Sequence, residues 1–382
     1  MTAYILDAVR TPRAKARPDG ALASLKPEAL VAGLIEAIEA RGHAAKSAEG
    51  LYLGSVGQVG AQGGHIALIS KLKAGLSDDA FAISLNNYCV SSLTAVGEAA
   101  AKVASGQADL VLAGGVEMMS RVPFMADRAD YYSDLSFDSR TRYIPVAVAA
   151  DRLAGDLDIS REELDAVALT SQQRAAAAEG TALNASRISI NGLDHDEATR
   201  PKTTAEGLAA LPPAFEAMAQ PYAAALEGQS ITWRHTISHA PPMTDGASMA
   251  LISSLPEGAR AKIIASVEVG GDPYASLTAG FSAMKKALEK AGLTLDDMDR
   301  IEFMEAFAVT IARLLRDYPV DHDRVNVGGG HIAKGHPMGA SGGILLSSLL
   351  DALDECQGRY GLVVMTGAQG VGSAMVVERL GF

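Results

Sequence analysis

The stretch that decides the fold is residues 82–93, Ala-Ile-Ser-Leu-Asn-Asn-Tyr-Cys-Val-Ser-Ser-Leu, which passes from a short strand through a tight turn into a helix. The strand is predicted at residues 82–85. The helix is predicted from about Ser91, because apolar residues then recur at helical spacing. Gly106 ends this helix, and residues 109–113 form an apolar strand that leads into two glycines. Strand, turn, helix and strand in this order are typical of an α/β protein.

The same plan occurs a second time near the end of the chain. A strand is predicted at residues 324–327, and a glycine-rich loop follows it. A helix from about Ser341 and an apolar strand at residues 361–365 complete this second unit. Between the two units, roughly residues 118–245 are richer in polar residues and short helices, which indicates an insertion lying over the core. The sequence therefore predicts a duplicated α/β core in which helices cover mainly parallel sheets.

The composition is that of a compact protein with two or three closely packed domains. The chain has 382 residues, of which 48% are hydrophobic and 20% are charged. The formal net charge of −12 argues against a nucleic-acid-binding surface. A basic cluster near the start, made of Arg10, Arg13, Lys15 and Arg17, is interpreted as a solvated loop.

Several features favour a cytoplasmic protein. The two cysteines are too few for a disulfide framework and suit a reducing compartment. The first ten residues lack a basic segment followed by an apolar run, so they are expected to form a first strand and not a signal peptide. No apolar segment reaches the roughly 18 residues that would span a membrane.

The first candidate for chemistry is Cys89, which lies where the predicted strand gives way to the helix. The unpaired N–H groups at a helix N-terminus are expected to lower the pKa of a thiol at this position. Cys356 follows Leu349 by seven residues and Leu353 by three, so a buried structural position is expected for it. On the residues alone, Cys89 is either a nucleophile or an ordinary buried cysteine.

The second candidate is the glycine-rich loop at residues 328–342, where so much glycine indicates backbone brought close to a ligand. His336 lies in this loop, before Pro337, and is interpreted as a base or hydrogen-bond donor. Residues 367–372 do not make a dinucleotide fingerprint, and no glycine loop ends as a P-loop does. His322, His331 and His336 lack the spacing of metal ligands, so no metal is expected.

These residues resemble the thiolase family, and within it the bacterial 3-ketoacyl-CoA and acetyl-CoA acyltransferases. The resemblance extends over the whole chain and is carried, in order, by residues 9–13, 86–93, 114–120, 200–204, 213–215, 245–247, 305–308 and 335–342. It implies a thiolase-like five-layered αβαβα fold of two duplicated halves with an inserted loop domain. It also implies a homodimer or homotetramer.

The resemblance suggests the following division of the chain. Residues 1–117 would form the N-terminal half, to which residues 246–262 return. Residues 118–245 would form the loop domain over the active site, and residues 263–382 the C-terminal half.

The resemblance also implies roles for particular residues. Cys89 would attack an acyl-CoA and hold the acyl group as a thioester, which suits a sulfur that is both a good nucleophile and a good leaving group. His336 would activate the thiol and help to bind the thioester oxygen. The backbone N–H groups of Cys89 and of Ala368, where the family has glycine, would form an oxyanion hole. Coenzyme A and acyl-CoA would be substrates, and no permanently bound cofactor is implied.

Three positions depart from the family pattern around this site. Thr366 aligns with the family's second cysteine, and a threonine hydroxyl cannot replace a thiol in proton transfer near neutral pH. Met304 replaces an asparagine amide, and a thioether is a poor hydrogen-bond partner. Pro241 stands where a polar side chain is expected near the pantetheine. The acylation of Cys89 is therefore expected to be intact, and the carbon–carbon step to be compromised or rebuilt.

The leading hypothesis is a thiolase-type acyltransferase that cleaves or forms a 3-oxoacyl-CoA. The alternative is an enzyme that acylates Cys89 but passes the acyl group to another acceptor or to water. A third hypothesis is a non-catalytic partner subunit of the same fold. His239 and His331 are candidates to replace the missing base, but the sequence does not place either of them in the site.

Overall fold

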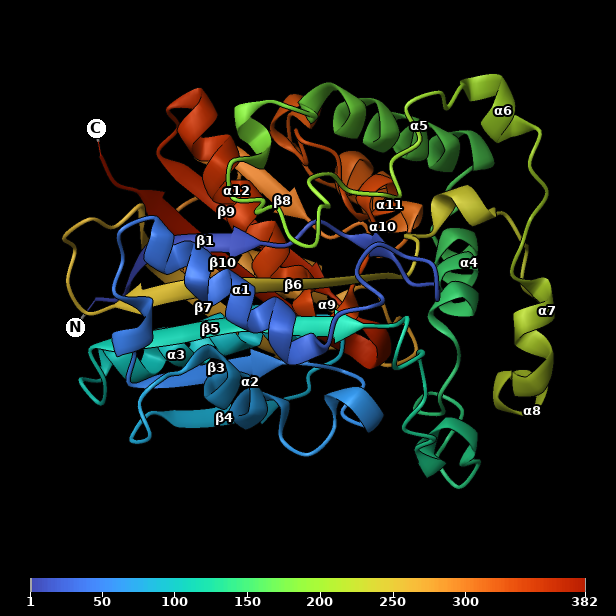
Figure 1. Cartoon of the computed structure of the whole chain (residues 1–382). Coiled ribbons are helices and arrows are strands. Elements are labelled where there is room, and N and C mark those ends of the chain that lie inside the picture. Colours follow the sequence, from blue (N-terminus) through green and yellow to red (C-terminus); the bar gives the residue numbers. More distant parts are fainter. Residues whose placement is uncertain (1, 382) are drawn as a thin grey trace.

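The computed structural model describes residues 2–381, and its core is one mixed β-sheet with helices on both sides (Figure 1). The strand order is β4-β3-β5-β6-β1-β7-β10-β9-β8, and β2 pairs with β6. The strands are β1 (Tyr4–Arg10), β2 (Ala14–Lys15), β3 (Gly50–Gly54), β4 (Phe81–Leu85), β5 (Leu110–Met118), β6 (Thr244–Ser253), β7 (Ala261–Gly270), β8 (Arg300–Phe303), β9 (Tyr360–Thr366) and β10 (Val371–Arg379). The predicted α/β class is confirmed. The expected mainly parallel pairing is wrong, because three of the strand pairs are parallel and six are antiparallel.

Twelve α-helices lie within the described residues. They are α1 (Pro27–Ala40), α2 (Ile66–Ala74), α3 (Ser91–Ala104), α4 (Val146–Asp156), α5 (Arg161–Ala178), α6 (Ala205–Ala209), α7 (Glu216–Ala219), α8 (Ala223–Leu226), α9 (Ala279–Ala291), α10 (Ala308–Asp317), α11 (His331–Lys334) and α12 (Ser341–Cys356). Over residues 2–381, none of the helices is both long and apolar enough to cross a bilayer. In Figure 1, α4 to α8 lie at one side and end of the sheet.

The two halves of the chain repeat one topology. In the first half, the sheet runs β4-β3-β5-β6-β1, with α1, α2 and α3 between successive strands. In the second half, it runs β8-β9-β10-β7, with α9, α10 and α12 in the matching places. Short antiparallel pairing between β1 and β7 joins the halves. The duplication predicted from the two strand-turn-helix-strand units is therefore present in the sheet.

One predicted strand of the second half is not formed. Residues 324–327 contribute only a single parallel bridge, between Val325 and Ile301, at the place of the expected strand. The next residue, Asn326, has a φ of 48° and leaves the extended conformation. Its side-chain amide accepts the N–H of Phe303 at 2.8 Å and donates to the carbonyl of the same residue at 2.8 Å. A side chain thus makes the bonds that further strand pairing would have made.

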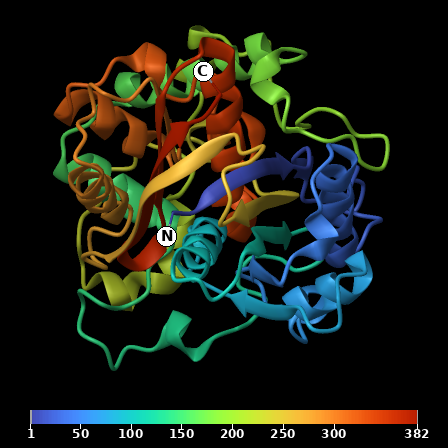
Figure 2. The ribbon, with the colours of Figure 1, turned by 90° about the vertical axis from the view of Figure 1, so that its left-hand side faces the viewer.

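The central helices α3 and α12 pack closely because α12 begins with glycines. A Cβ added to Gly342 would lie 2.7 Å from Leu93, so only glycine permits this distance. The N–H of Gly343 donates to the hydroxyl of Ser92 at 2.9 Å. The contact brings the N-terminal ends of the two helices together. In Figure 2, α3 is seen close to β7 of the second half.

Candidate active site

Cys89 lies in the turn between β4 and α3, as predicted, and Ser91 holds this turn in shape. The Ser91 hydroxyl donates to the Tyr88 carbonyl at 2.6 Å and accepts the N–H of Asn87 at 2.8 Å. Tyr88 has a φ of 47°, an uncommon conformation for a bulky residue. The turn therefore fixes the direction of the Cys89 side chain, which is partly buried.

His336 lies in the loop between α11 and α12, and its imidazole contacts the Cys89 thiol. Nε2 of His336 is 3.2 Å from Sγ of Cys89, and Nδ1 is 2.7 Å from the Ser341 hydroxyl. The backbone N–H of His336 donates to the carbonyl of Pro242 at 2.9 Å. If Nδ1 carries the proton and donates to Ser341, Nε2 is left to accept a proton from the thiol. Two residues 247 positions apart are thus paired.

The pKa values of this pair favour two neutral groups at rest. Burial, and then the charge of Glu117, raise the pKa of the Cys89 thiol to about 12. Burial, and then the charge of Arg13, lower the pKa of His336 to about 3. The predicted lowering of the Cys89 pKa by the helix N-terminus is therefore wrong. Cys89 precedes the N-cap residue Val90, and burial outweighs the N–H groups near its sulfur.

Two backbone N–H groups are directed at the sulfur. Hydrogen bonds from the N–H groups of Cys89 and Ala368 act to lower the pKa of the thiol, against the larger effect of burial. A Cβ added to the neighbouring Gly367 would lie 3.7 Å from the Cys89 Cβ, so the segment after β9 runs close to the nucleophile turn. The structure thus brings together the two amides that were expected to form an oxyanion hole.

Arg13 is a site residue that the sequence interpretation missed. Arg10 and Arg13 are fully buried, whereas Lys15 and Arg17 are exposed, so the solvated-loop interpretation is wrong for the first two. Nη1 of Arg13 donates to the carbonyl of Gly335 at 3.0 Å, directly before His336. No local pattern distinguished the buried arginines, because their partner Asp196 lies more than 180 residues away.

Glu117 is a second missed residue, and it ties three segments together at the end of β5. Its carboxylate accepts the N–H groups of Val56, Gly57 and Gly339 at 2.8–3.1 Å, and the side-chain amide of Gln62 at 2.6 Å. These bonds fix the start of the loop that carries α12 against the first half of the sheet.

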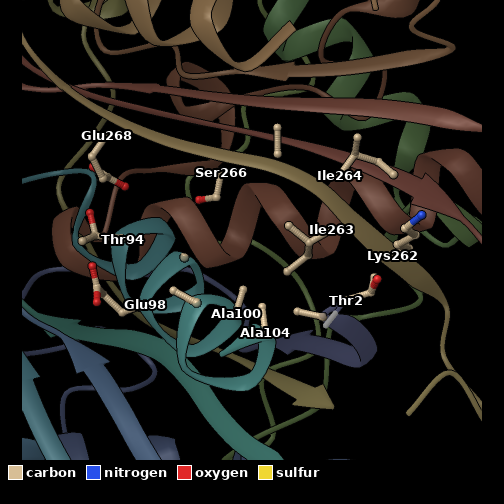
Figure 3. A pocket seen from close by; sticks show the side chains of 14 residues that line it. Thr2, Thr94, Glu98, Ala100, Ala104, Lys262, Ile263, Ile264, Ser266 and Glu268 are labelled. Carbon is tan, nitrogen blue, oxygen red and sulfur yellow. The ribbon is translucent and has the colours of Figure 1, made fainter. Parts of the chain in front are cut away.

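A cavity away from these residues lies between α3 and β7. It has a volume of about 510 Å³, and neither Cys89 nor His336 is among the residues that line it. Figure 3 shows side chains of α3, such as Thr94 and Glu98, facing side chains of β7, such as Ser266, across the space. Within residues 2–381, no group of three or more His, Cys, Asp or Glu side chains is arranged to hold a metal ion.

Comparison with known proteins decides the family. Residues 3–255 match the family described as Thiolase, N-terminal domain, and residues 258–379 match Thiolase, C-terminal domain. The chain belongs to the thiolase family. It is accordingly an enzyme of the thiolase type, an acyl-CoA acyltransferase.

Thiolases similar in sequence match over nearly the full length. A beta-ketoadipyl-CoA thiolase of Acinetobacter baylyi is 36% identical, with 99% of each chain covered. A 3-oxoadipyl-CoA/3-oxo-5,6-dehydrosuberyl-CoA thiolase of Escherichia coli is 34% identical, again with 99% of each covered. A human mitochondrial 3-ketoacyl-CoA thiolase, solved in complex with CoA, superposes with a TM-score of 0.87 at 28% identity, over 100% of this chain and 98% of that one.

The three positions that depart from the thiolase pattern lie as follows. The Thr366 hydroxyl is buried and accepts the N–H of Gly280 at 3.4 Å, at the start of α9. Met304 is buried in the main hydrophobic core. Pro241 is half-buried and precedes Pro242, whose carbonyl accepts the His336 N–H.

Cys356, expected to be buried, is only half-buried, because it lies in the last turn of α12.

Proposed function

We propose that Cys89 is the acyl-carrying nucleophile of this thiolase and that His336 is its general base. The observation that carries the proposal is the 3.2 Å contact between His336 Nε2 and Cys89 Sγ. A base within hydrogen-bond reach of a thiol is the arrangement that nucleophilic catalysis requires. The Ser341 hydroxyl at Nδ1 orients the ring and would favour the tautomer that accepts the thiol proton.

The raised pKa of Cys89 and the lowered pKa of His336 determine how acylation would proceed. Because a stable thiolate–imidazolium pair is disfavoured, the proton would pass to Nε2 as the sulfur attacks the thioester carbon. The carbonyl oxygen would then become negatively charged beside the N–H groups of Cys89 and Ala368. Such donors stabilise an oxyanion, and removal of one typically costs about 10²–10³ in rate. His336 would return the proton to the departing CoA sulfur.

The substrate class we propose is 3-oxoacyl-CoA, cleaved by CoA or formed in the reverse direction. Relatives at 32–36% identity are named beta-ketoadipyl-CoA thiolases, and one at 34% is named as a 3-ketoacyl-CoA thiolase. These names support CoA as the acyl acceptor over another acceptor or water. A role in fatty acid metabolism is part of the same proposal.

We also propose a cytoplasmic homodimer or homotetramer with no permanently bound cofactor, in which residues 118–245 form a loop domain over the site. The contact of Pro242 with His336 and of Asp196 with Arg13 supports this placement of the inserted segment.

Acylation is the step to test first. The purified protein would be incubated with acetyl-CoA and with a panel of 3-oxoacyl-CoA thioesters, including 3-oxoadipyl-CoA. Intact-protein mass and released CoA would be measured. Cys89→Ser should fold but form no acyl-enzyme, because a serine hydroxyl is far less acidic than a thiol. Cys356→Ser is the matched control and should acylate as the wild type does. An acyl group carried by the Cys89→Ser protein would show that the nucleophile is another residue.

A further inference from the structure

The side chain of Asn87 bonds the turn at residues 86–90, which we call the nucleophile turn, to the second half of the chain. Asn87 lies two residues before Cys89. Its side-chain amide donates to the Thr94 hydroxyl of α3 at 3.1 Å and to Oε2 of Glu268 on β7 at 3.3 Å. An asparagine NH2 group has two protons, and both are used here. Asn87 therefore joins the nucleophile turn to a strand 181 residues further along the chain.

Glu268 is itself held in place by β10. In the antiparallel pairing of β7 with β10, its Cα lies opposite that of Ser373. The buried Ser373 hydroxyl donates to Oε1 of Glu268 at 2.7 Å. One carboxylate oxygen thus binds the sheet of the second half and the other binds the nucleophile turn, so the carboxylate keeps the Asn87 amide in one position.

The nucleophile turn needs this support because its backbone is strained. Tyr88, between Asn87 and Cys89, has a φ of 47°. A bulky residue keeps such a conformation only where surrounding contacts impose it. The Ser91 hydroxyl supplies such contacts from within α3, and Glu268 supplies one from the opposite half. Without Glu268, the Cys89 sulfur is expected to shift from its base, and a shift of about 1 Å can slow a reaction strongly.

The Glu268 carboxylate can exchange its proton through the cavity between α3 and β7. Glu268, Thr94 and Glu98 line one end of this cavity, as Figure 3 shows. Lys262 also lines the cavity, but it lies six residues away along β7, which is about 20 Å in an extended strand. Among residues 2–381, no cation forms an ion pair with Glu268.

The Glu268 carboxylate changes its charge near neutral pH. Although Glu268 is an exposed residue, its carboxylate contacts Thr94 and Ser373, and burial there raises the pKa of Glu268 to about 7. Hydrogen bonds from Ser373 and Thr94 act to lower this pKa, and the charge of Glu98 acts to raise it. The ionised carboxylate is the stronger acceptor for the Asn87 amide, since hydrogen bonds to a charged acceptor are about twice as strong as neutral ones.

We propose that Glu268 is a positioning residue for acylation: its ionised carboxylate holds Asn87, and Asn87 holds the turn that directs the Cys89 sulfur. The proposal rests on the proposed function, in which Cys89 carries the acyl group. Glu268 acts through the nucleophile turn and not on the reacting atoms. Acylation is therefore fastest when Glu268 is ionised, and it slows as the pH falls through about 7.

Other titrating groups near the site can be separated from Glu268 by substitution. The pKa of Cys89 is about 12 and that of His336 about 3, so neither changes its charge between pH 5.5 and 8.5. Burial lowers the pKa of Lys334 and raises that of Glu302, which brings both nearer to neutral pH. An effect of Lys334 or Glu302 on acylation would remain in a Glu268 variant, whereas the effect of Glu268 would not.

The experiment measures the rate of Cys89 acylation by acetyl-CoA from pH 5.5 to 8.5, from intact-protein mass at timed intervals. The wild-type rate should rise about fivefold with a midpoint near pH 7, because a hydrogen bond to a charged acceptor is the stronger one. Glu268→Gln keeps the shape but not the charge, so it should stay near the low rate at every pH. The acetyl-CoA concentration at half-maximal rate should change less than about twofold, because Glu268 does not act on the reacting atoms.

Two further variants move the midpoint in opposite directions. Glu98→Gln removes the same charge from the same cavity without touching the turn, so it should keep the rise and shift its midpoint to lower pH. Ser373→Ala removes a bond that favours the ionised form, so it should shift the midpoint to higher pH.

A wild-type acylation rate that does not change with pH would overturn the proposal, and so would a folded Glu268→Gln protein that keeps the wild-type rise. If Glu268→Gln does not fold, the Glu98→Gln and Ser373→Ala profiles decide, and midpoints that do not move apart contradict the proposal. A wild-type protein that forms no acyl-enzyme at any pH would instead overturn the proposed function, and this inference with it.

Discussion

The Cys89 sulfur is surrounded by groups with opposing effects on its proton. Burial and Glu117 hold the proton on the sulfur, and the N–H groups of Cys89 and Ala368 act in the other direction. Burial and Glu117 have the larger effect and raise the thiol pKa to about 12. The site therefore keeps a protonated nucleophile that becomes reactive only when a substrate and His336 act together.

This balance predicts how alkylation of Cys89 depends on pH. Because the thiolate is the reactive form, and because a pKa near 12 leaves little thiolate at neutral pH, the rate with iodoacetamide should rise about tenfold per pH unit from pH 7 to 10. The measurement is the time course of the alkylated Cys89 peptide, with the Cys356 peptide followed in the same digest. A rate that levels off below about pH 8 would contradict the raised pKa.

A second prediction concerns Thr366. Its hydroxyl makes one long bond, to the N–H of Gly280 at 3.4 Å, so a cysteine should fit at little cost in stability. Thr366→Cys should raise α-proton exchange and thiolysis at least about tenfold, because a thiol can transfer protons near neutral pH and a hydroxyl cannot. Both rates would be measured beside acylation, which should not change. If neither rate moves, position 366 does not limit the carbon–carbon step.

At the scale of elements, the site depends on where helices begin. Cys89 precedes α3 and His336 precedes α12, and the glycine contact between these helices brings the two residues together. Both elements were predictable, because helical periodicity begins at Ser91 after a tight turn and at Ser341 after a glycine-rich loop. The structure confirms both starts and extends the predicted strand at 109–113 to Leu110–Met118.

What the sequence did not predict are the contacts between distant segments. Asp196 accepts from Arg10 Nη1 and from the N–H of Arg13, both at 2.9 Å, across more than 180 residues. Neither residue type nor spacing distinguishes these arginines from surface ones. The reduction of the predicted strand at 324–327 to a single bridge at Val325 was also missed, since a strand pattern does not reveal that the Asn326 side chain will bond to Phe303.

A prediction at the scale of elements concerns Asp196, which binds Arg10 and Arg13. Burial alone would raise its pKa, but the charges of Arg10 and Arg13 outweigh burial and hold the pKa well below its usual range. Its ionised form therefore stabilises the fold above the unfolded pKa of about 3.9, and this stability is lost as the pH falls further. Asp196→Asn should lower the free energy of unfolding at pH 7 by about 3–5 kcal/mol, because buried guanidinium groups lose their partner.

The measurement is urea unfolding at pH 5 to 8, where the loss should be nearly constant. Asp194→Asn is the matched control, since Asp194 is exposed and its partner His195 is exposed as well. Equal stability of the Asp196→Asn and Asp194→Asn proteins would mean that the buried pair does not hold the inserted segment to the core.

At the scale of the whole molecule, the two edge strands of the duplicated sheet, β4 and β8, differ in exposure. At one end, β8 is buried apart from its first residue. At the other end, β4 is partly exposed along its whole length, and Ile83 at its centre has an exposed fraction of 41%. An exposed apolar edge strand is a template for pairing with another chain, and natural proteins protect such edges when they remain monomeric. The unprotected edge supports the proposal that the chain assembles with itself.

We predict that this assembly uses β4. A lysine at the centre of the edge would place a charge in the contact, so Ile83→Lys should shift the protein to a smaller species at the same concentration, measured by light scattering after size exclusion. Leu255→Lys is the control, because Leu255 is 62% exposed but follows β6 in a loop. Because β4 leads directly into the turn that carries Cys89, loss of a partner should also loosen that turn and slow acylation. An Ile83→Lys protein with the mass and acylation rate of the wild type would place the subunit contact elsewhere.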